Sequence, residues 1–384
     1  MKASHERKFL PVGHGAFFIE RLFVEGKRGF TAVYDCGDSK AGELVKKFAS
    51  QEFGPESAPT EKIDILFISH FDKDHVSGLR YLQPYLTKRT RVFLPFYYPT
   101  LQSVYDSNKR VGIEEVISVL SAVSIKPILV RYRGAGDRES EIDVDQHNFD
   151  GNGNVIESGQ PLIKKAGGKP IWRYVPFNLF NEEKHYKDFE SEVVNHLHWS
   201  LSKLEDPKSW TKKDISDLKG VYSSIDSLTI NDNSLLVLSD RYVKGRTSPK
   251  VKLPFIQRSG AFPFVFTRYA YLSCLYTGDS VLKRDVPKWS KYCDCYEDFL
   301  MELHRFTDNL ALMQVPHHGS GNNINMAALC DCFSLGLFSN YSAEDVGNKV
   351  FFLKQANLQS VWKTVIGVTE DPKTLFVKKH SFTV

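Results

Sequence analysis

Short apolar runs separated by glycine-rich turns open the chain, and this pattern predicts strands before any helix. Three strands are predicted at residues 9–12, 16–23 and 30–34. Helices and strands then alternate: the predicted helices are residues 41–53, 79–86 and 113–123, and the predicted strands are residues 63–69, 91–96 and 128–132. Residues 63–69 are so apolar that both faces of this strand are expected to be buried. Such interleaving is typical of a layered α/β protein.

The middle of the chain is less regular. Residues 134–159 are rich in acids, asparagine and glycine, and are predicted to form a loop. The remaining predicted strands are residues 171–179, 234–238, 262–276, 311–315, 362–368 and 374–378, and the remaining predicted helices are residues 186–204, 208–219 and 296–306. With no internal repeat, we predict one domain over residues 1–384, with an irregular insertion region at 134–230 and a basic loop insertion at 241–261.

Composition narrows the class of protein. The 384 residues are 42% hydrophobic and 25% charged, which excludes a disordered or low-complexity chain. The sequence has no apolar run long enough for a membrane-spanning helix and none at its start that resembles a signal peptide, so we expect no membrane partner and a cytoplasmic location. The pairs Cys293/Cys295 and Cys330/Cys332 raise the alternative of a second zinc site. Their one-residue gap is shorter than structural zinc sites use, which favours buried thiols.

The strongest chemical signal is the run Ser69-His70-Phe71-Asp72-Lys73-Asp74-His75, directly after the buried strand. Four potential metal ligands fall within six residues at the carboxyl end of a strand, where α/β proteins place their sites. A polar loop with a helix cap at Asp74 or Ser77 is the plainer reading. It explains one residue and leaves two histidines and a second aspartate without a role. We therefore predict a metal site.

The same run resembles the signature of the metallo-β-lactamase fold, with Asp72 at a position where His is usual. This variant is typical of the nuclease-like domain of the DNA-uptake protein ComEC and its soluble relatives. Five further segments, in the order of that branch, are similar to its motifs: residues 10–16, 33–37, 231–238, 275–279 and 314–320. One departure is that Asn340-Tyr341-Ser342 is followed by no His, where this branch carries a Tyr-Gly-His-Pro stretch. The resemblance implies an α/β fold, an αββα four-layer sandwich with insertions.

The resemblance also implies a dinuclear metal site that holds Zn²⁺ or Mn²⁺ and hydrolyses its substrate through a metal-activated hydroxide. One metal would be held by Asp74, His75 and His317, and the other by His70 and Asp72, with Asp279 as the bridge and Asp232 as a further ligand. Asp74 is expected to be catalytic as well as a ligand. The carboxylates in place of histidines shift the preference towards harder ions such as Mn²⁺.

Two further histidines have open roles. His318 could protonate a leaving group or orient His317, and we include it among the catalytic residues. His14 lies between two glycines, and could approach the metals or phosphates or cap a turn.

Charge along the chain bears on the substrate. The net charge is only +4, but residues 241–278 carry seven basic residues and no acidic one. Both ends of this segment are expected near the metals, and its early part, residues 241–258, to face phosphate rather than to form a solvated hairpin. The candidate substrate-binding residues are His14, Lys244, Arg246, Lys250, Lys252 and Arg258.

The function predicted is therefore that of a metal-dependent phosphodiesterase or nuclease acting on DNA, with RNA as an alternative substrate. Two other functions stay open. One is a nuclease effector of a bacterial defence or toxin module, controlled by a regulatory protein partner that binds the region 134–230. The other is hydrolysis of a small ester, thioester or lactam.

Overall fold

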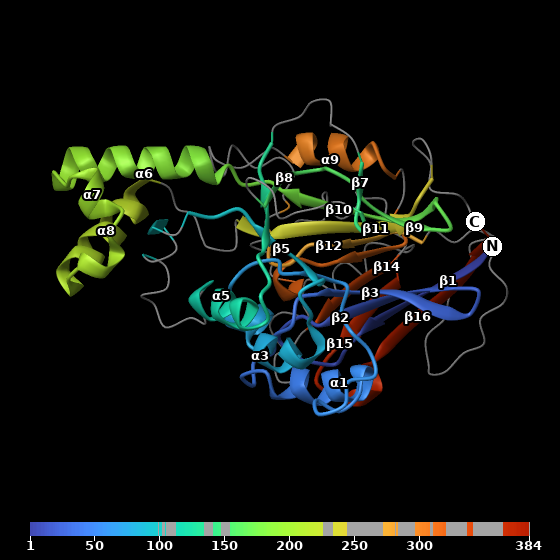
Figure 1. Cartoon of the computed structure of the whole chain (residues 1–384). Helices are drawn as coiled ribbons and strands as arrows, with labels where there is room; N and C mark the ends of the chain where they lie inside the picture. Colours follow the sequence, from blue (N-terminus) through green and yellow to red (C-terminus); the bar gives the residue numbers. More distant parts are fainter. Residues whose placement is uncertain are drawn as a thin grey trace.

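The computed structural model describes residues 1–98, 100–101, 104, 113–133, 141–146, 154–225, 233–243, 272–280, 282, 296–307, 310–319, 336–340 and 364–383. Two mixed sheets of eight strands each lie face to face in this part of the chain. Helices cover their outer sides (Figure 1). The αββα four-layer arrangement implied by the sequence is therefore confirmed.

The first sheet is built mostly from the first 160 residues. Its strand order is β16-β1-β2-β3-β4-β5-β6-β8, antiparallel from β16 to β3 and parallel from β3 to β8. The strands are β1 (Lys2–Phe9), β2 (Phe18–Val24), β3 (Lys27–Tyr34), β4 (Ile65–Phe67), β5 (Arg91–Pro95), β6 (Ile128–Arg131), β8 (Val155–Glu157) and β16 (Phe376–Thr383). Its outer face packs on α1 (Glu43–Phe53), α3 (Leu79–Leu82) and α5 (Ile113–Ala122).

The second sheet follows the order β15-β14-β13-β12-β11-β10-β9-β7. Its strands are β7 (Ile142–Asp143), β9 (Leu162–Ala166), β10 (Lys169–Asn178), β11 (Leu235–Arg241), β12 (Cys274–Tyr276), β13 (Leu312–Gln314), β14 (Gly336–Asn340) and β15 (Thr364–Val368). Helix α9 (Tyr296–His304) packs on its outer face through Phe299 and Leu303. The largest hydrophobic cluster fills the space between the two sheets.

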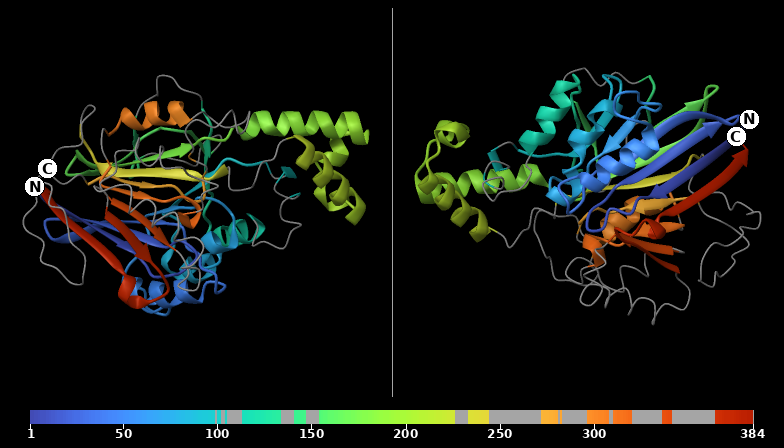
Figure 2. Two further views of the ribbon diagram at one scale, coloured as in Figure 1. Left: turned by 180° about the vertical axis from the view of Figure 1, so that it is seen from behind. Right: turned by 90° about the horizontal axis from the view of Figure 1, so that it is seen from below.

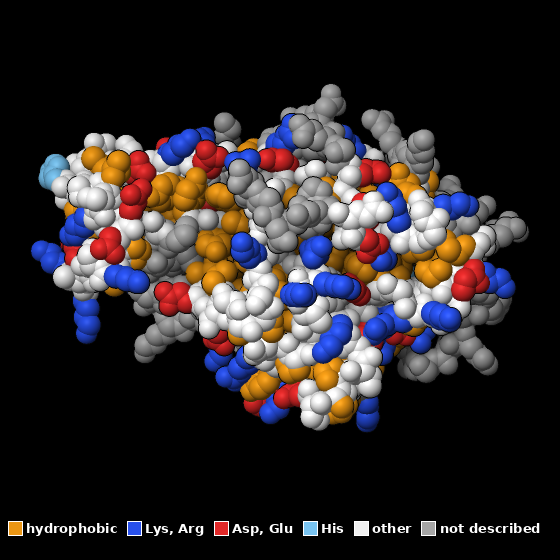
Figure 3. Space-filling model, in the orientation of Figure 1, with side chains coloured by type: hydrophobic (Ala, Val, Ile, Leu, Met, Phe, Trp, Pro, Cys, Tyr) orange, Lys and Arg blue, Asp and Glu red, His pale blue; other side chains and the backbone are white. Residues whose placement is uncertain are grey.

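Helices α6 (Glu182–Leu197), α7 (Leu201–Leu204) and α8 (Lys212–Ile225) form an arm that projects from the sandwich (Figures 1 and 2). The arm has its own hydrophobic core, which includes Phe189, Leu204 and Leu218 and also takes in Leu101 and Val104 from the segment after β5. Hydrophobic side chains are visible on the surface where the arm meets the body (Figure 3). In the described part of the chain, no helix is long and apolar enough to cross a membrane.

Several sequence expectations need correction. The first strand is β1 at Lys2–Phe9 rather than residues 9–12, and the last strand extends to Thr383. Both were hidden because inward-facing positions carry His5, Arg7 and His380, which are buried although they are polar. The region 134–230, predicted to be an insertion, contains regular elements where it is described. It supplies β7 to β10 and the arm. Strands β7 and β8 have only two and three residues, so their strand conformation depends on pairing with neighbouring strands.

Candidate metal centre

One strand of the first sheet and two of the second deliver the candidate ligands. Strand β4 lies between β3 and β5, and the loop 69–72 that follows it leads into the one-turn helix α2 (Lys73–Val76). From the second sheet, β12 ends three residues before Asp279, and β13 is followed by the 3-10 turn η4 (His317–Gly319). The centre therefore forms between the two sheets, at the carboxyl ends of β4, β12 and β13.

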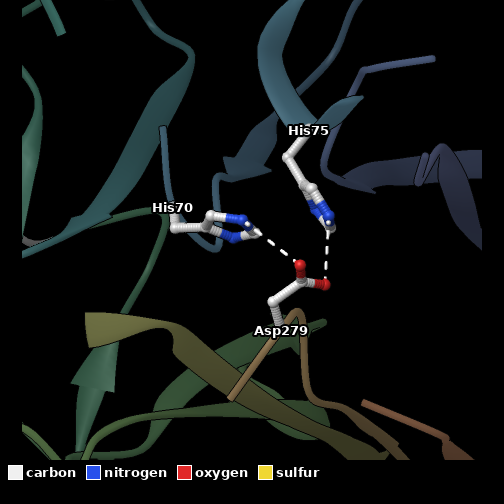
Figure 4. A group of neighbouring side chains, drawn as sticks. All are labelled: His70, His75 and Asp279. Carbon is white, nitrogen blue, oxygen red and sulfur yellow. Dashed lines mark ion pairs between the residues drawn. The ribbon is translucent and has the colours of Figure 1, made fainter. Parts of the chain in front are cut away.

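The innermost group consists of His70, His75 and Asp279, all of which are buried. Nε2 of His75 lies 3.3 Å from Oδ1 of Asp279, and Nε2 of His70 lies 3.8 Å from Oδ2 of the same carboxylate. Figure 4 shows both imidazole rings pointing at this carboxylate from the opposite sheet. One divalent ion would fit between these three donors.

A second group consists of Asp74, His75 and His318. Nε2 of His318 lies 3.1 Å from Oδ2 of Asp74, which is 3.9 Å from Nε2 of His75. Within each group of three, the ligand atoms lie within 4.8 Å of one another. His75 belongs to both groups, so the two candidate positions adjoin.

The hydrogen bonds behind the rings determine which nitrogen faces the centre. Asp35 is fully buried and its Oδ2 lies 2.8 Å from Nδ1 of His75, so this ring carries its proton on Nδ1. Oγ of Ser69 donates to Oδ2 of Asp35 at 2.7 Å, and lies 2.9 Å from Nδ1 of His70. Because the single hydroxyl hydrogen of Ser69 is already used, Nδ1 of His70 must donate to it. Both rings therefore turn Nε2 towards Asp279. Burial alone would lower the pKa of His75, but Asp279 and Asp35 raise it well above the usual range.

This arrangement passes a test of fit for a cation. Among the described residues, no group forms a hydrogen bond with Nε2 of His70 or of His75, although both atoms are buried. A buried imidazole nitrogen without a hydrogen bond is costly unless a ligand occupies it. Nitrogen lone pairs that converge with carboxylates are the donors that Zn²⁺ and Mn²⁺ bind.

The carboxylates are held in their charged form. Burial alone would raise the pKa of Asp279, but His75 and His70 lower it well below the usual range. The pKa of Asp74 is also lowered, because His75 and His318 outweigh the effect of burial. Burial, with His75 adding to it, lowers the pKa of His70 and favours its neutral, metal-binding form.

The other predicted ligands lie at different distances from this centre. Oδ2 of Asp72 is 4.0 Å from Nε2 of His70, and Nε2 of His317 is 3.8 Å from Oδ2 of Asp279. The His317 side chain is 36% exposed, whereas that of His318 is 6% exposed, so His318 is the more enclosed of the pair. The ring of His14 lies 5.0 Å from that of His318, which places it at the margin of the centre. Asp232 lies outside the described residues.

Only one end of the basic segment, residues 241–278, lies beside the centre as the sequence predicted. Strand β11 begins beside the centre, where the backbone N–H of Leu235 donates to the carbonyl of Ser69. It ends at Arg241, about 20 Å further along at the rise of a strand. The chain returns at Leu272 and reaches the centre only through β12, which is antiparallel to β11. The Arg241 end of the segment therefore lies at the far end of the sheet. Its Gly278 end adjoins Asp279, and the Gly278 carbonyl accepts from the backbone N–H of His317. Its candidate residues Lys244, Arg246, Lys250, Lys252 and Arg258 lie outside the described residues.

Sequence reasoning gave no role to three residues that hold the ligands in place. Asp35 and Ser69 support the two rings, and Gln314 joins the segments that deliver Asp279 and His318. Its Oε1 accepts from the backbone N–H groups of Thr277 and Gly278 at 2.9 and 3.2 Å. Little in the sequence indicated these roles, because Asp35, Ser69 and Gln314 each lie within a recognised motif but contact a segment that is distant in the sequence.

The turn that follows β13 has an unusual backbone conformation at two adjacent residues. His317 and His318 have φ values of 47° and 53°, in the left-handed region that residues other than glycine rarely adopt. The backbone N–H of His317 donates to the carbonyl of Gly278, which ties this turn to the one carrying Asp279. Strain at two adjacent residues is typical of functional sites.

Comparison with known proteins does not identify the function of the centre. No protein-family model matches the chain, and no curated protein matches it in sequence. Among solved structures, the chain is similar to a long form RNase Z from yeast, with 11% sequence identity and a TM-score of 0.29. The alignment covers 82% of this chain and 32% of that one, so it spans about a third of the yeast protein.

Proposed function

We propose that this protein is a metal-dependent hydrolase that binds two divalent ions, Zn²⁺ or Mn²⁺, and cleaves phosphodiesters, DNA foremost. The observation that carries the proposal is the pair of adjoining donor groups that share His75. Their imidazole nitrogens are oriented by hydrogen bonds with Asp35 and Ser69 on the far side of each ring. Such preorganisation is what a catalytic metal site requires.

The residues of the chain have separate tasks in this proposal. His70 and Asp279 would hold one ion, and Asp74 and His318 the other. His75, with a single Nε2 lone pair, would complete only one of the two positions. Asp72 and His317 stand close enough to complete the two positions. When bound, two such ions would acidify a water molecule and neutralise charge on an attacked phosphoryl group. His14, beside His318, is in a position to contact the substrate.

The donor chemistry supports a phosphodiester over a lactam or thioester. Three carboxylates, from Asp72, Asp74 and Asp279, make the centre rich in oxygen and suit harder ions. Two adjacent ions stabilise both the attacking and the leaving oxygen of an in-line displacement at phosphorus. The ComEC-like motifs point to DNA, and RNA is the alternative polymer.

The test uses the full chain reconstituted with Mn²⁺ or with Zn²⁺. Plasmid DNA, single-stranded DNA, RNA and bis-p-nitrophenyl phosphate are compared with a thioester and a lactam probe. We expect cleavage of the phosphodiesters, and loss of at least about a hundredfold in the Asp74→Ala and His75→Ala variants. Turnover of the thioester or lactam alone would contradict the proposal and favour the small-molecule alternative.

A second candidate, an effector nuclease controlled by a regulatory protein, is favoured by the helical arm. The arm is a folded unit with its own core and lies outside the sandwich that holds the centre. If a partner acts through it, replacing exposed Leu201 at the arm with Asp should leave cleavage of bis-p-nitrophenyl phosphate unchanged. Loss of that activity would assign the arm to the chemistry instead.

A further inference from the structure

A buried ion pair between Arg7 and Glu20 lies in the space between the two sheets. Nε of Arg7 is 2.6 Å from Oε1 of Glu20, and the two side chains are 0% and 4% exposed. Burial alone would raise the pKa of Glu20, but Arg7 and His5 lower it well below the usual range, so the pair is charged. Both residues belong to the first sheet, Arg7 on β1 and Glu20 on β2.

Besides His5 on β1, which lies 3.3 Å from Oε2 of Glu20, the pair makes its further hydrogen bonds to the second sheet and the segment before β12. Nη1 of Arg7 donates to the carbonyl of Leu272 at 3.2 Å, and Nε of Arg7 to the hydroxyl of Tyr276 at 3.1 Å. The Tyr276 hydroxyl in turn donates to Oε1 of Glu20 at 2.7 Å. Ser239 on β11 donates to Oε2 of Glu20 at 2.6 Å. The pair therefore bonds β11 and both ends of the segment that forms β12.

Strand β12 needs such support. It has only three residues, and it pairs with β11 at three positions and with β13 at two. Tyr276 is its last residue and stands three positions before Asp279. Apolar packing between two sheets is not directional, so it leaves a short strand free to shift. Hydrogen bonds to a buried charge restrict the distance of β12 from the first sheet and its register along the neighbouring strands.

The centre depends on that register because its ligands come from both sheets. His70 and His75 follow β4 of the first sheet, whereas Asp279 follows β12 of the second. A second cross-sheet contact adjoins the first: the ring of Tyr34 stacks on that of Tyr276 at 4.8 Å, and its hydroxyl donates to the carbonyl of Leu235. Tyr34 directly precedes Asp35, the residue that orients His75.

We infer that the Arg7–Glu20 pair is a positioning element of the metal centre, which fixes β12 against the first sheet and so sets Asp279 at its distance from His70 and His75. The inference rests on the proposed function of that centre. Stability alone does not require a buried ion pair at this place, so the positioning of β12 would explain why the two charges are there. Replacing a buried ion pair by apolar residues of similar size is often neutral or stabilising.

The test removes the pair together, since deleting one partner would leave an unpaired buried charge. The variant Arg7→Met/Glu20→Leu keeps the volume and apolar contact, and Tyr276→Phe removes only the hydroxyl. Tyr85→Phe is the matched control, because Tyr85 is fully buried and donates its hydroxyl to the carbonyl of Gly54, away from the centre. Stability is measured by urea unfolding, and Mn²⁺ affinity by calorimetry.

We expect both test variants to unfold cooperatively and to bind Mn²⁺ about tenfold more weakly than the wild type, with no such change in Tyr85→Phe. Amide hydrogen exchange at Thr277 and Gly278 should also be faster in the test variants, with or without Mn²⁺. Wild-type affinity and wild-type exchange in the test variants would overturn the inference. Failure of the wild type to bind either Mn²⁺ or Zn²⁺ would instead overturn the proposed function, while the exchange rates would still decide whether the pair holds β12.

Discussion

The carboxylate of Asp35 lies 2.8 Å from Nδ1 of His75, although 40 residues separate them in sequence. Asp35 follows β3 and His75 belongs to the helix after β4, and the parallel pairing of the two strands brings them together. The backbone of Asp35 has a φ of 56°, in the left-handed region, which turns the side chain towards Ser69. One buried carboxylate therefore orients the rings on both sides of the centre.

Replacing Asp35 with Asn should weaken metal binding while the fold persists. An amide carries no charge and supports Nδ1–H of His75 less strongly, so we expect Mn²⁺ or Zn²⁺ affinity to fall by about ten- to a hundredfold. Calorimetry gives the affinity. The control is Asp38→Asn in the same loop, where the carboxylate accepts from backbone N–H groups such as those of Gly42 and Val45. It should cost about 1–3 kcal/mol of stability and leave metal affinity unchanged.

His317 and His318 should differ in metal binding. His318 is the more buried and reaches Asp74 at 3.1 Å, so His318→Ala should remove about one bound ion per chain. His317 is more exposed and 3.8 Å from Asp279, so His317→Ala should retain more metal. Elemental analysis of dialysed protein measures the content. The reverse order would assign the ligand role to His317, as the sequence resemblance implies.

Glu182, at the start of α6, predicts a pH dependence of stability. Burial raises the pKa of this carboxyl from 4.5 to about 8. Between these values the unfolded chain releases a proton that the folded protein keeps, so the free energy of unfolding falls as the pH rises from 4.5 to 8. The loss amounts to roughly 3–5 kcal/mol and is complete above the folded-state pKa.

Urea unfolding of the wild type and of Glu182→Gln at several pH values measures this effect. The difference between the two proteins should grow in favour of the variant as the pH rises, because Gln has no proton to lose. Glu183→Gln serves as the control, since the Glu183 side chain is 45% exposed. A constant difference across the pH range would show that the Glu182 carboxyl is ionised in the folded protein.

The features that were predicted best from the sequence are those that depend on a local pattern of residues. The loop after β4 was identified because His70, Asp72, Asp74 and His75 are close in sequence and follow an apolar strand. Strands β1 and β16 were misplaced because polar residues occupy their inward positions, and Arg7 is buried only because Glu20 and the second sheet receive it. The Arg241 end of the basic segment was misplaced for another reason: an apolar run shows that a strand exists but not which way it leads from the centre.

Glycine at position 37 should be essential for the geometry of the centre. A Cβ added there would lie 2.3 Å from the carbonyl carbon and oxygen of Asp74 and 2.4 Å from the backbone nitrogen of His75. These are backbone atoms of α2, which carries Asp74 and His75, so Gly37→Ala must displace α2 itself. We expect a loss of about 1–3 kcal/mol in stability together with weaker Mn²⁺ binding. Gly220→Ala is the control, because a Cβ at this helical position meets nothing within 4 Å and should stabilise α8 by about 0.5–1 kcal/mol. Unchanged metal affinity in folded Gly37→Ala would show that the centre tolerates a shift of α2, and would weaken the case for a preorganised site.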